Sequence, residues 1–336
     1  MTLILSHLSR GFALQVSDRL VTSTRPGDSP SPFDALANKT IIYQARDAIV
    51  SMSYTGPAYI GQLPTDDWIA KTLTGVDTSE KFSFRTGPLP QWWDIGRATR
   101  LLLRELACTE IAAQKSNFEL IAIGWQWKNV KRSMEGLYQP VPMAWGVSKP
   151  EGSGFEKEVE RLPRRWHWKH RSFFCAAPRC NLDKAEQVKL FDRLTEEIAQ
   201  SPAPKTSEEV ADRVERVTVD TVRAVAVSNP YVGPNCMSVV IAPPHQSALI
   251  RVTFFPFEQH TAQLVGKTFV PITLPAAFSP WIIGQGTMHK PSVHMGKGSW
   301  DIRLGPFALK LNGPDGPQKG LLAAMSSQQR PRRPTG

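Results

Sequence analysis

The first two strands of the chain are predicted from residues Thr2–Arg19, which read TLILSHLSRGFALQVSDR. Two apolar runs, Thr2–Leu8 and Phe12–Val21, flank the turn Ser9–Gly11, and a glycine in such a turn favours a β-hairpin. Side chains two residues apart share a face of a strand, which places Asp18 in the apolar row of the second run. A carboxylate on a buried face costs free energy unless it is paired or hydrogen-bonded. Asp18 is therefore the first candidate for a functional residue.

The segments that follow predict a second pair of strands and a helix. The strands cover Lys39–Gln44 and Ala48–Tyr54, with a short turn between them. The helix begins near Thr65 and ends near Gly75, because two aspartates in its first turn suit the positive end of the helix dipole and glycine is a common helix stop.

The rest of the chain alternates between helical and strand patterns. Apolar side chains recur at helical spacing over Asp94–Ala113, Asp183–Gln200 and Ser207–Val227. The third of these begins with a capping box, Thr206 to Glu209. Strands are predicted over Phe118–Trp127, Ser172–Ala176, Cys236–Ala242 and Ala248–Phe255.

Two regions read differently from their surroundings. Lys128–Arg165 is rich in glycine and proline and is predicted to be irregular, and Ser326–Gly336 is predicted to be a disordered tail. The order of strands, two helices, strands, two helices and strands indicates an α+β fold, in which helices lie outside two packed sheets.

Composition narrows the class of protein. The chain has 336 residues, 41% hydrophobic and 21% charged, which is typical of a folded protein rather than a disordered one. No apolar run is long enough to span a membrane, and no cleavable signal peptide is evident. The four cysteines are scattered, which favours a reducing, cytoplasmic compartment over a disulfide scaffold. The seven histidines lack the spacing of a metal site, and no cofactor is predicted.

The basic residues are distributed unevenly along the chain. The net charge is +10, and the segment from His245 to the end holds ten basic and three acidic residues, which accounts for seven of those charges. A second basic cluster, Arg161–Arg171, contains Trp166 and Trp168 between its cations. Such a cluster can stack on the bases of a nucleic acid, but aromatic residues of this kind more often pack under a loop. A nucleic-acid partner is therefore the less favoured hypothesis.

The chemistry-bearing residues gather near the first strands. Threonine is small enough for removal of Met1 to be expected, which would give Thr2 both a hydroxyl nucleophile and a free α-amine that can accept its proton. A neighbouring lysine would favour the neutral amine, and a buried aspartate would orient that lysine. Lys39 and Asp18 are the candidates. Each also has a simpler interpretation: Thr2 as an ordinary second residue, Asp18 as a paired or bulge residue, and Lys39 as a solvated strand end.

These residues together resemble the proteasome β-subunit branch of the N-terminal-nucleophile hydrolases. The resemblance rests on Thr2, on Asp18 sixteen residues later, on Lys39 at the start of the third strand, and on Tyr54-Thr55-Gly56 before a helix. It covers the first 75 residues well and continues weakly to Ala242. The loop before Lys39 and the segment from Lys39 to Gly56 are longer than is usual in that family.

The resemblance implies a four-layer α-β-β-α sandwich and hydrolysis of an amide bond by Thr2. Asp18 and Lys39 would orient and tune the nucleophile, and the backbone amide of Gly56 would stabilise the oxyanion. Ser228 is the loose match to a serine that supports the nucleophile in the family, and the aspartate that accompanies it there has no counterpart here. Members of the family often form rings, so a homo-oligomer is a further expectation.

The sequence therefore predicts an N-terminal-nucleophile hydrolase-like domain over residues 1–245, a β-rich C-terminal extension over 246–325 and a tail over 326–336. The predicted function is that of a threonine-dependent peptidase or amidase with a peptide or other amide as substrate. The alternative is a noncatalytic protein that uses the same fold for assembly or partner binding.

Overall fold

The computed structural model describes most of the chain. The described residues are 2–9, 11–23, 31–34, 37–78, 85–86, 89–114, 117–129, 138–149, 156–158, 172–177, 189–190, 192–193, 196, 206–243, 249–255, 264–265, 268–269, 276–278, 280–284, 287–290, 292–294, 299–304 and 307–312. Predictions for Arg161–Arg171, the tail over 326–336 and most of Asp183–Gln200 lie outside these residues.

The first sheet contains seven strands and is built around the N-terminal hairpin. Its order is β13 (Ser172–Ala177), β1 (Ile4–Ser9), β2 (Ala13–Asp18), β14 (Cys236–Ile241), β15 (Leu249–Phe255), β23 (Phe307–Asn312) and β22 (Ser299–Leu304). The predicted β1–β2 hairpin is present, with Ile4 opposite Ser17 and Leu8 opposite Ala13. β15 and β23 are parallel, and the other neighbours in this sheet are antiparallel.

The second sheet contains eight strands. Its order is β12 (Glu156–Glu158), β11 (Tyr138–Lys149), β10 (Phe118–Asn129), β6 (Ala48–Thr55), β5 (Thr40–Gln44), β19 (Trp281–Gly284), β20 (Thr287–His289) and β9 (Arg85–Thr86). β19 is parallel to β5, with Trp281 opposite Ile41.

Four two-stranded ribbons complete the strands. They pair β3 (Val21–Ser23) with β4 (Ser31–Asp34), β7 (Tyr59–Ile60) with β8 (Leu63–Pro64), β16 (Leu264–Val265) with β17 (Thr268–Phe269), and β18 (Ala276–Phe278) with β21 (Ser292–His294).

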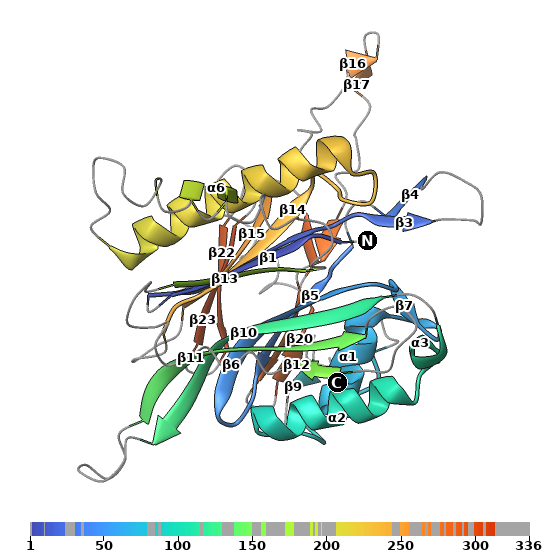
Figure 1. Ribbon diagram of the computed structural model, residues 1–336, viewed down its shortest axis with the longest axis vertical. Helices are drawn as coiled ribbons and strands as arrows, with labels where there is room; N and C mark the ends of the chain where they lie inside the picture. Colours follow the sequence, from blue (N-terminus) through green and yellow to red (C-terminus); the bar gives the residue numbers. More distant parts are fainter. Residues whose placement is uncertain are drawn as a thin grey trace, which may run out of the picture.

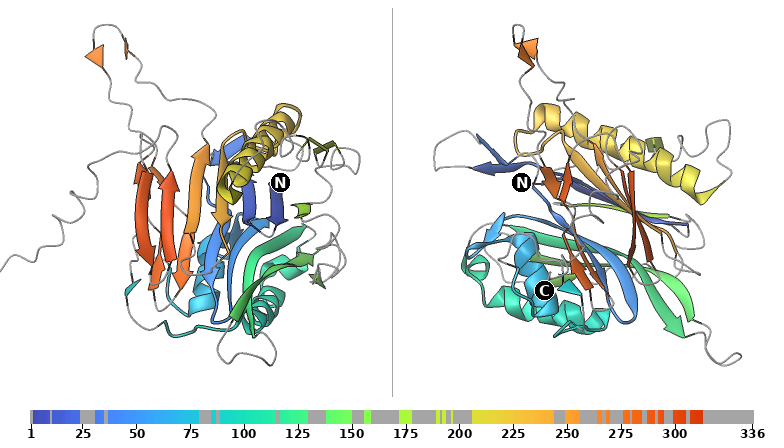
Figure 2. Two further views of the ribbon diagram at one scale, coloured as in Figure 1. Left: turned by 90° about the vertical axis from the view of Figure 1, so that its left-hand side faces the viewer. Right: turned by 180° about the vertical axis from the view of Figure 1, so that it is seen from behind.

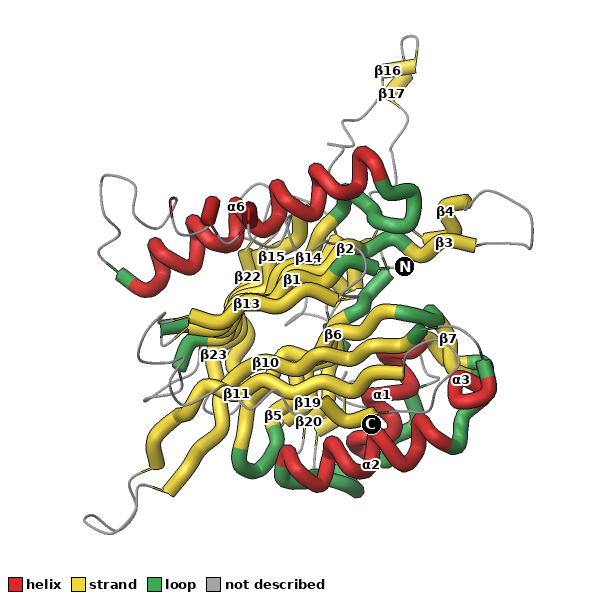
Figure 3. The backbone as a smooth tube through the Cα atoms, in the orientation of Figure 1, coloured by secondary structure: helices red, strands yellow, loops and turns green. Residues whose placement is uncertain are grey.

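The two sheets face each other, and helices cover their outer faces (Figures 1 and 3). One hydrophobic cluster joins residues of both sheets, such as Met237 and Phe254 from the first and Ile49 and Trp125 from the second. Another packs the outer face of the first sheet against α6 (Ser207–Ser228), and a third packs the outer face of the second sheet against α1 (Thr65–Thr74) and α2 (Ile95–Ala107). The chain is thus an α+β protein, as the sequence predicted.

The sequence signals locate the end of α1 and the start of α6. Gly75 adopts a left-handed conformation (φ 69°) that ends α1. The side chain of Thr206 accepts a hydrogen bond from the Glu209 amide at 3.1 Å, which caps α6. The single helix predicted over Asp94–Ala113 is divided into α2 and the short α3 (Glu110–Ala113).

The prediction that Lys128–Arg165 is irregular is wrong for β11 and β12. β11 pairs with β10 along its whole length, although it contains Pro140 and Pro142. Proline cannot donate to a sheet ladder and is tolerated at edges. Since β12 pairs only with Gly146–Ser148, both prolines lie in the part of β11 that has no second described neighbour. The two prolines therefore mark the part of β11 that is paired on one side among the described strands, rather than a loop.

The C-terminal strands continue both main sheets (Figure 2). β15, β23 and β22 extend the first sheet, and β19 and β20 extend the second. The predicted boundary between residues 245 and 246 falls between β14 and β15, which are paired antiparallel neighbours. It is thus not a boundary between two sheets.

Among the described helices, none has the length and apolar character needed to cross a membrane.

His7 is a titratable side chain buried in β1. It is only 4% exposed and stacks on Phe12 with ring centroids 5.3 Å apart. Its Nδ1 atom has no hydrogen-bond partner within the described part of the chain. Burial lowers the pKa of His7 from 6.5 to about 4, because the charged imidazolium loses its hydration. Between these values the unfolded chain binds a proton that the folded chain does not, so stability falls as pH falls through this window.

Replacing His7 with phenylalanine should make the protein less sensitive to acid. His7→Phe keeps an aromatic ring beside Phe12 and removes the titration, which is worth up to roughly 3 kcal/mol over this pH range. Urea unfolding of both proteins at about pH 4.5 and about pH 7.5 measures the effect. An equal loss of unfolding free energy in the two proteins would show that His7 does not titrate in this way.

Candidate active site

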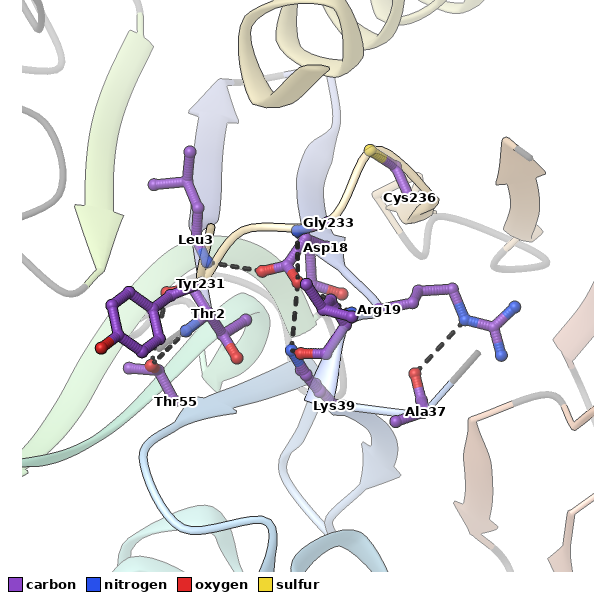
Figure 4. A network of polar contacts seen from close by, with 12 residues as sticks. Thr2, Leu3, Asp18, Arg19, Ala37, Lys39, Thr55, Tyr231, Gly233 and Cys236 are labelled. Carbon is purple, nitrogen blue, oxygen red and sulfur yellow. Dashed lines mark hydrogen bonds and ion pairs between the residues drawn. The ribbon is translucent and has the colours of Figure 1, made fainter. Parts of the chain in front are cut away.

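The predicted site residues come from strand ends that meet at one end of the two sheets. Thr2 lies two residues before β1, Asp18 ends β2, and Lys39 immediately precedes β5. An antiparallel hairpin brings the start of its first strand to the end of its second, which places Thr2 near Asp18. Figure 4 shows Thr2, Asp18 and Lys39 close together between the two hairpins.

The Asp18 carboxylate is the centre of this network. It is completely buried. Its Oδ2 accepts a hydrogen bond from the Leu3 amide at 2.6 Å, and its Oδ1 accepts from the amides of Leu20 at 2.9 Å and Gly233 at 3.3 Å. Oδ1 also accepts from Lys39 Nζ at 3.1 Å, which is an ion pair. These donors offset the desolvation of the carboxylate, so the odd position of Asp18 in the apolar row is explained.

Lys39 is held from two sides. Its ammonium group is 4% exposed and donates to the carbonyl oxygen of Leu20 as well as to Asp18. Burial lowers the pKa of Lys39 below its ordinary value, and the Asp18 carboxylate opposes this shift. The interpretation of Lys39 as a solvated strand end is therefore wrong.

Thr2 is fixed by Thr55, the last residue of β6. The backbone nitrogen of Thr2 donates to Thr55 Oγ1 at 3.1 Å, and the Thr55 hydroxyl donates to the Thr2 carbonyl at 3.3 Å. Thr2 itself is 4% exposed. The contact joins the segment that leads into the first sheet to the end of a strand in the second, across 53 positions of sequence. Sequence reasoning assigned Thr55 no role of its own.

Gly56 directly follows Thr55 and needs to be glycine. Its φ of +119° is a conformation that other residues rarely adopt. A Cβ atom there would also lie 2.6 Å from the backbone oxygen of Asn117. The glycine therefore lets the chain turn away from β6 close to the start of β10.

A second buried network links the sheets beside the site. The Ser51 and Ser53 hydroxyls both donate to Gln15 Oε1 at 2.8 Å. Ser53 Oγ is also 2.7 Å from Thr40 Oγ1, which lies 3.3 Å from Ser17 Oγ. Ser17 and Thr40 are the chain neighbours of Asp18 and Lys39. These hydrogen bonds therefore fix the spacing of the two strands that carry the ion pair.

The loop after α6 reaches the site through Gly233 rather than through Ser228. Ser228 is exposed at the end of α6, where its hydroxyl donates to the Val225 carbonyl of the same helix at 3.2 Å. A role for Ser228 in catalysis stays a prediction. In the sequence, only the presence of a glycine in the loop after α6 could have pointed to Gly233.

Cys236 is the other nucleophilic side chain near Asp18. It pairs with Asp18 across β14 and β2, and it is buried. Burial raises the pKa of its thiol to about 12. The thiolate is the reactive form of cysteine, so Cys236 is a protonated core residue at neutral pH.

Within the described residues, no group of three or more histidine, cysteine, aspartate or glutamate side chains is placed to hold a metal ion.

Comparison with known proteins finds distant similarity in structure only. No family model matches the chain, and no curated protein matches it. Similar solved structures include Anbu from Hyphomicrobium sp. strain MC1 (13% identity, TM-score 0.35), covering 73% of this chain and 83% of that one. They also include Anbu (ancestral beta-subunit) from Yersinia bercovieri (14% identity, TM-score 0.35), covering 72% of this chain and 81% of that one.

A third similar structure is the helical assembly of the Anbu complex from Pseudomonas aeruginosa. It has 13% identity and a TM-score of 0.38, and it covers 73% of this chain and 82% of that one. At these identities and TM-scores, the chemistry of the site has to be inferred from the residues of this chain.

Breaking the buried ion pair should destabilise the protein strongly. Asp18→Asn leaves the Lys39 ammonium buried without its carboxylate, which should cost about 3 kcal/mol or more. The double variant Asp18→Asn/Lys39→Met should lose less than the sum of the two single variants, because neither charge is then left alone. Urea unfolding at neutral pH measures all three.

The exposed pair Lys71–Asp77 is the matched control. Its atoms are 3.9 Å apart and its side chains are 49% and 68% exposed, so Asp77→Asn should cost well under about 1 kcal/mol. An Asp18→Asn variant as stable as Asp77→Asn would contradict the central position of Asp18.

Gly56 should tolerate a side chain less well than Gly61. Gly61 also has a positive φ, of 59°, but no atom lies within 4 Å of a Cβ placed there. Gly61→Ala should therefore cost only the conformational term of about 1–2 kcal/mol. Gly56→Ala should cost clearly more, because the new methyl group meets the backbone of Asn117. Equal unfolding free energies for the two variants would contradict this explanation.

Proposed function

We propose that the chain is a threonine-dependent N-terminal-nucleophile hydrolase that cleaves an amide bond. The observation that carries the proposal is the buried Asp18–Lys39 pair at the end of β2 and the start of β5, with the Leu3 amide bound to the same carboxylate. Because Leu3 follows Thr2, the carboxylate fixes the backbone directly beside the proposed nucleophile. The stacking of α6, two sheets and the α1–α2 pair supports a four-layer α-β-β-α sandwich of this hydrolase type.

The proposed reaction begins once Met1 is removed. The hydroxyl oxygen of Thr2 adds to the carbonyl carbon of the substrate, and the α-amine of Thr2 accepts the hydroxyl proton. The tetrahedral intermediate then expels the amine product, which takes up this proton, and leaves an acyl ester on Thr2. Attack of water on the ester releases the acid and restores the hydroxyl.

The neighbouring groups support these steps. The Thr55 hydroxyl lies 3.1 Å from the Thr2 nitrogen, where it can orient the free amine. The positive charge of Lys39 favours the neutral, basic form of that amine. The backbone amide of Gly56, one residue beyond Thr55, is the proposed donor to the oxyanion. A homo-oligomer, and a role for the basic regions in binding a partner, stay predictions.

Peptide hydrolysis and intact mass test the proposal together. The wild-type protein should lack Met1 and should hydrolyse a mixture of fluorogenic peptides. Thr2→Ala should lose this activity by at least about a hundredfold, whereas Thr2→Ser, which keeps a hydroxyl and an α-amine, should retain part of it. Ser228→Ala tests the remaining predicted site residue in the same assay.

Two results would contradict the proposal. Complete retention of Met1 would mean that the α-amine of Thr2 does not exist. Equal activity in Thr2→Ala and wild type would mean that another group is the nucleophile. Absence of activity in a protein that has lost Met1 would favour the alternative, a noncatalytic protein that keeps the fold for assembly.

A further inference from the structure

A small pocket lies beside the Thr2 network. Its volume is about 130 Å³, and Asn38 and Tyr54 form part of its wall. These residues are the chain neighbours of Lys39 and Thr55, so the pocket and the proposed nucleophile share the same two strand ends. A pocket of this size suits one side chain rather than an extended segment of a partner.

The charges around the pocket favour a cation. Asp34 and Asp66 line it, and Lys290 is the one cationic side chain among the lining residues that the structure describes. Lys290 already binds two carboxylates, with Nζ 2.7 Å from Asp66 Oδ2 and 2.6 Å from Asp67 Oδ1. Among these described residues, the carboxylates of Asp34, Asp66 and Asp67 against the Lys290 ammonium leave an excess of two negative charges in and beside the pocket.

The nearest other charges reduce this excess without reversing it. Lys39 is paired with Asp18, so the two cancel. Arg19 contributes one further positive charge, and its guanidinium lies over the Phe254 ring at 5.0 Å from the centroid. Because opposite charges attract more strongly where solvent is partly excluded, a cationic group entering the pocket gains free energy and an anionic group loses it.

The aromatic residues of the pocket point to the same kind of ligand. Tyr54 and Tyr59 both line it. The Tyr54 hydroxyl donates to the Asn38 carbonyl at 3.1 Å, which fixes its ring in the wall. A cation over a tyrosine face is attracted by the negative charge of the π system. Tyrosine side chains and carboxylates in one pocket wall are suited to a guanidinium or ammonium group on an alkyl stem.

Lys290 connects the pocket to the C-terminal part of the chain. It follows β20, and its ammonium lies over the Trp281 ring at 5.3 Å from the centroid. The Trp281 indole nitrogen donates to Asp67 Oδ1, the oxygen that Lys290 also binds, at 2.6 Å. The segment from Trp281 to Lys290 therefore holds the first turn of α1 in place, and with it the Asp66 wall of the pocket.

We propose that this pocket binds the arginine or lysine side chain of the substrate residue whose carbonyl group Thr2 attacks. Asp34 and Asp66 supply the negative charge, and Lys290, itself part of the pocket wall, fixes Asp66 through its ion pair. The role in cleavage rests on the proposed function, whereas the binding of a cationic side chain by the pocket does not require catalysis.

Hydrolysis gives the first readout. Fluorogenic peptides acetyl-Ala-Ala-X-aminomethylcoumarin, with arginine, norleucine or glutamate at X, differ in charge at one side chain. The wild-type protein should cleave the arginine peptide with a kcat/KM at least about tenfold higher than the norleucine peptide, and the glutamate peptide least well. A preference for norleucine or glutamate would overturn the proposal.

Variants identify the groups responsible. Asp34→Asn and Asp66→Asn should each lower the ratio of arginine to norleucine cleavage by about fivefold or more. Asp77→Asn, which removes an exposed carboxylate after α1, should leave the ratio unchanged. Asp34 is exposed, so Asp34→Asn remains informative if Asp66→Asn fails to fold. An unchanged ratio in Asp34→Asn, together with an unchanged ratio or loss of folding in Asp66→Asn, would overturn the assignment.

Binding without cleavage separates this proposal from the proposed function. Acetyl-Ala-Ala-X-amide peptides with the same three residues at X can be titrated into Thr2→Ala and followed by isothermal calorimetry or NMR. Tighter binding of the arginine peptide by at least about tenfold, lost in Asp34→Asn, supports the pocket even if the wild-type protein hydrolyses nothing. Equal binding of the three peptides, or none at millimolar concentration, overturns the pocket whatever the result for hydrolysis.

Discussion

The arrangement of the N-terminal end of the protein depends on one buried carboxylate. Asp18 accepts hydrogen bonds from three backbone amides and from Lys39, and those donors belong to four separate segments. An unpaired carboxylate in this position would cost several kcal/mol, so the segments have to meet around it. The carboxylate thus holds four segments together: the residue before β1, the end of β2, the start of β5 and the loop before β14.

The fold supplies the rigidity that this point needs. The hydrophobic core between the sheets and the Gln15 network beside it fix the distance from the first hairpin to the second. Thr55 then joins the two sheets at Thr2 itself. Farther from the site, the C-terminal strands extend both sheets, and Lys290 binds two aspartates in the first turn of α1. A strand pairing made late in the chain therefore shapes the surroundings of residues near its beginning.

Local patterns predicted the parts of the fold that depend on neighbouring residues. Alternation in Phe12–Val21 marked Asp18 in the apolar row of β2, although both faces of that strand are buried. The helix signals at Thr206 and Gly75 located the ends of α6 and α1. β11 was missed because Pro140 and Pro142, in the part of the strand without a second described neighbour, resemble loop residues when the pairing partner is not known. The parallel pairing of β19 with β5 joins segments far apart in sequence, and no local pattern encodes it.

The site likewise combines residues that local patterns identify with residues that only long-range contacts bring together. Asp18 could be selected from its place in an apolar row and Lys39 from its place at the start of a predicted strand, and the structure brings them to 3.1 Å. Thr55 and Gly233 reach the site through contacts over 53 and 215 positions, which sequence reasoning on a single chain does not reveal. The exposed position of Ser228 likewise follows from where α6 ends relative to the loop.

Mapping the site of covalent modification tests the central claim most directly. A peptide epoxyketone reacts stably with a residue that offers both a hydroxyl and a free amine. After treatment of the wild-type protein and digestion with trypsin, tandem mass spectrometry should find the adduct on the peptide Thr2–Arg10, with Met1 absent and the modification at Thr2. An adduct on another residue, or an unmodified N-terminal peptide that still carries Met1, would contradict the account.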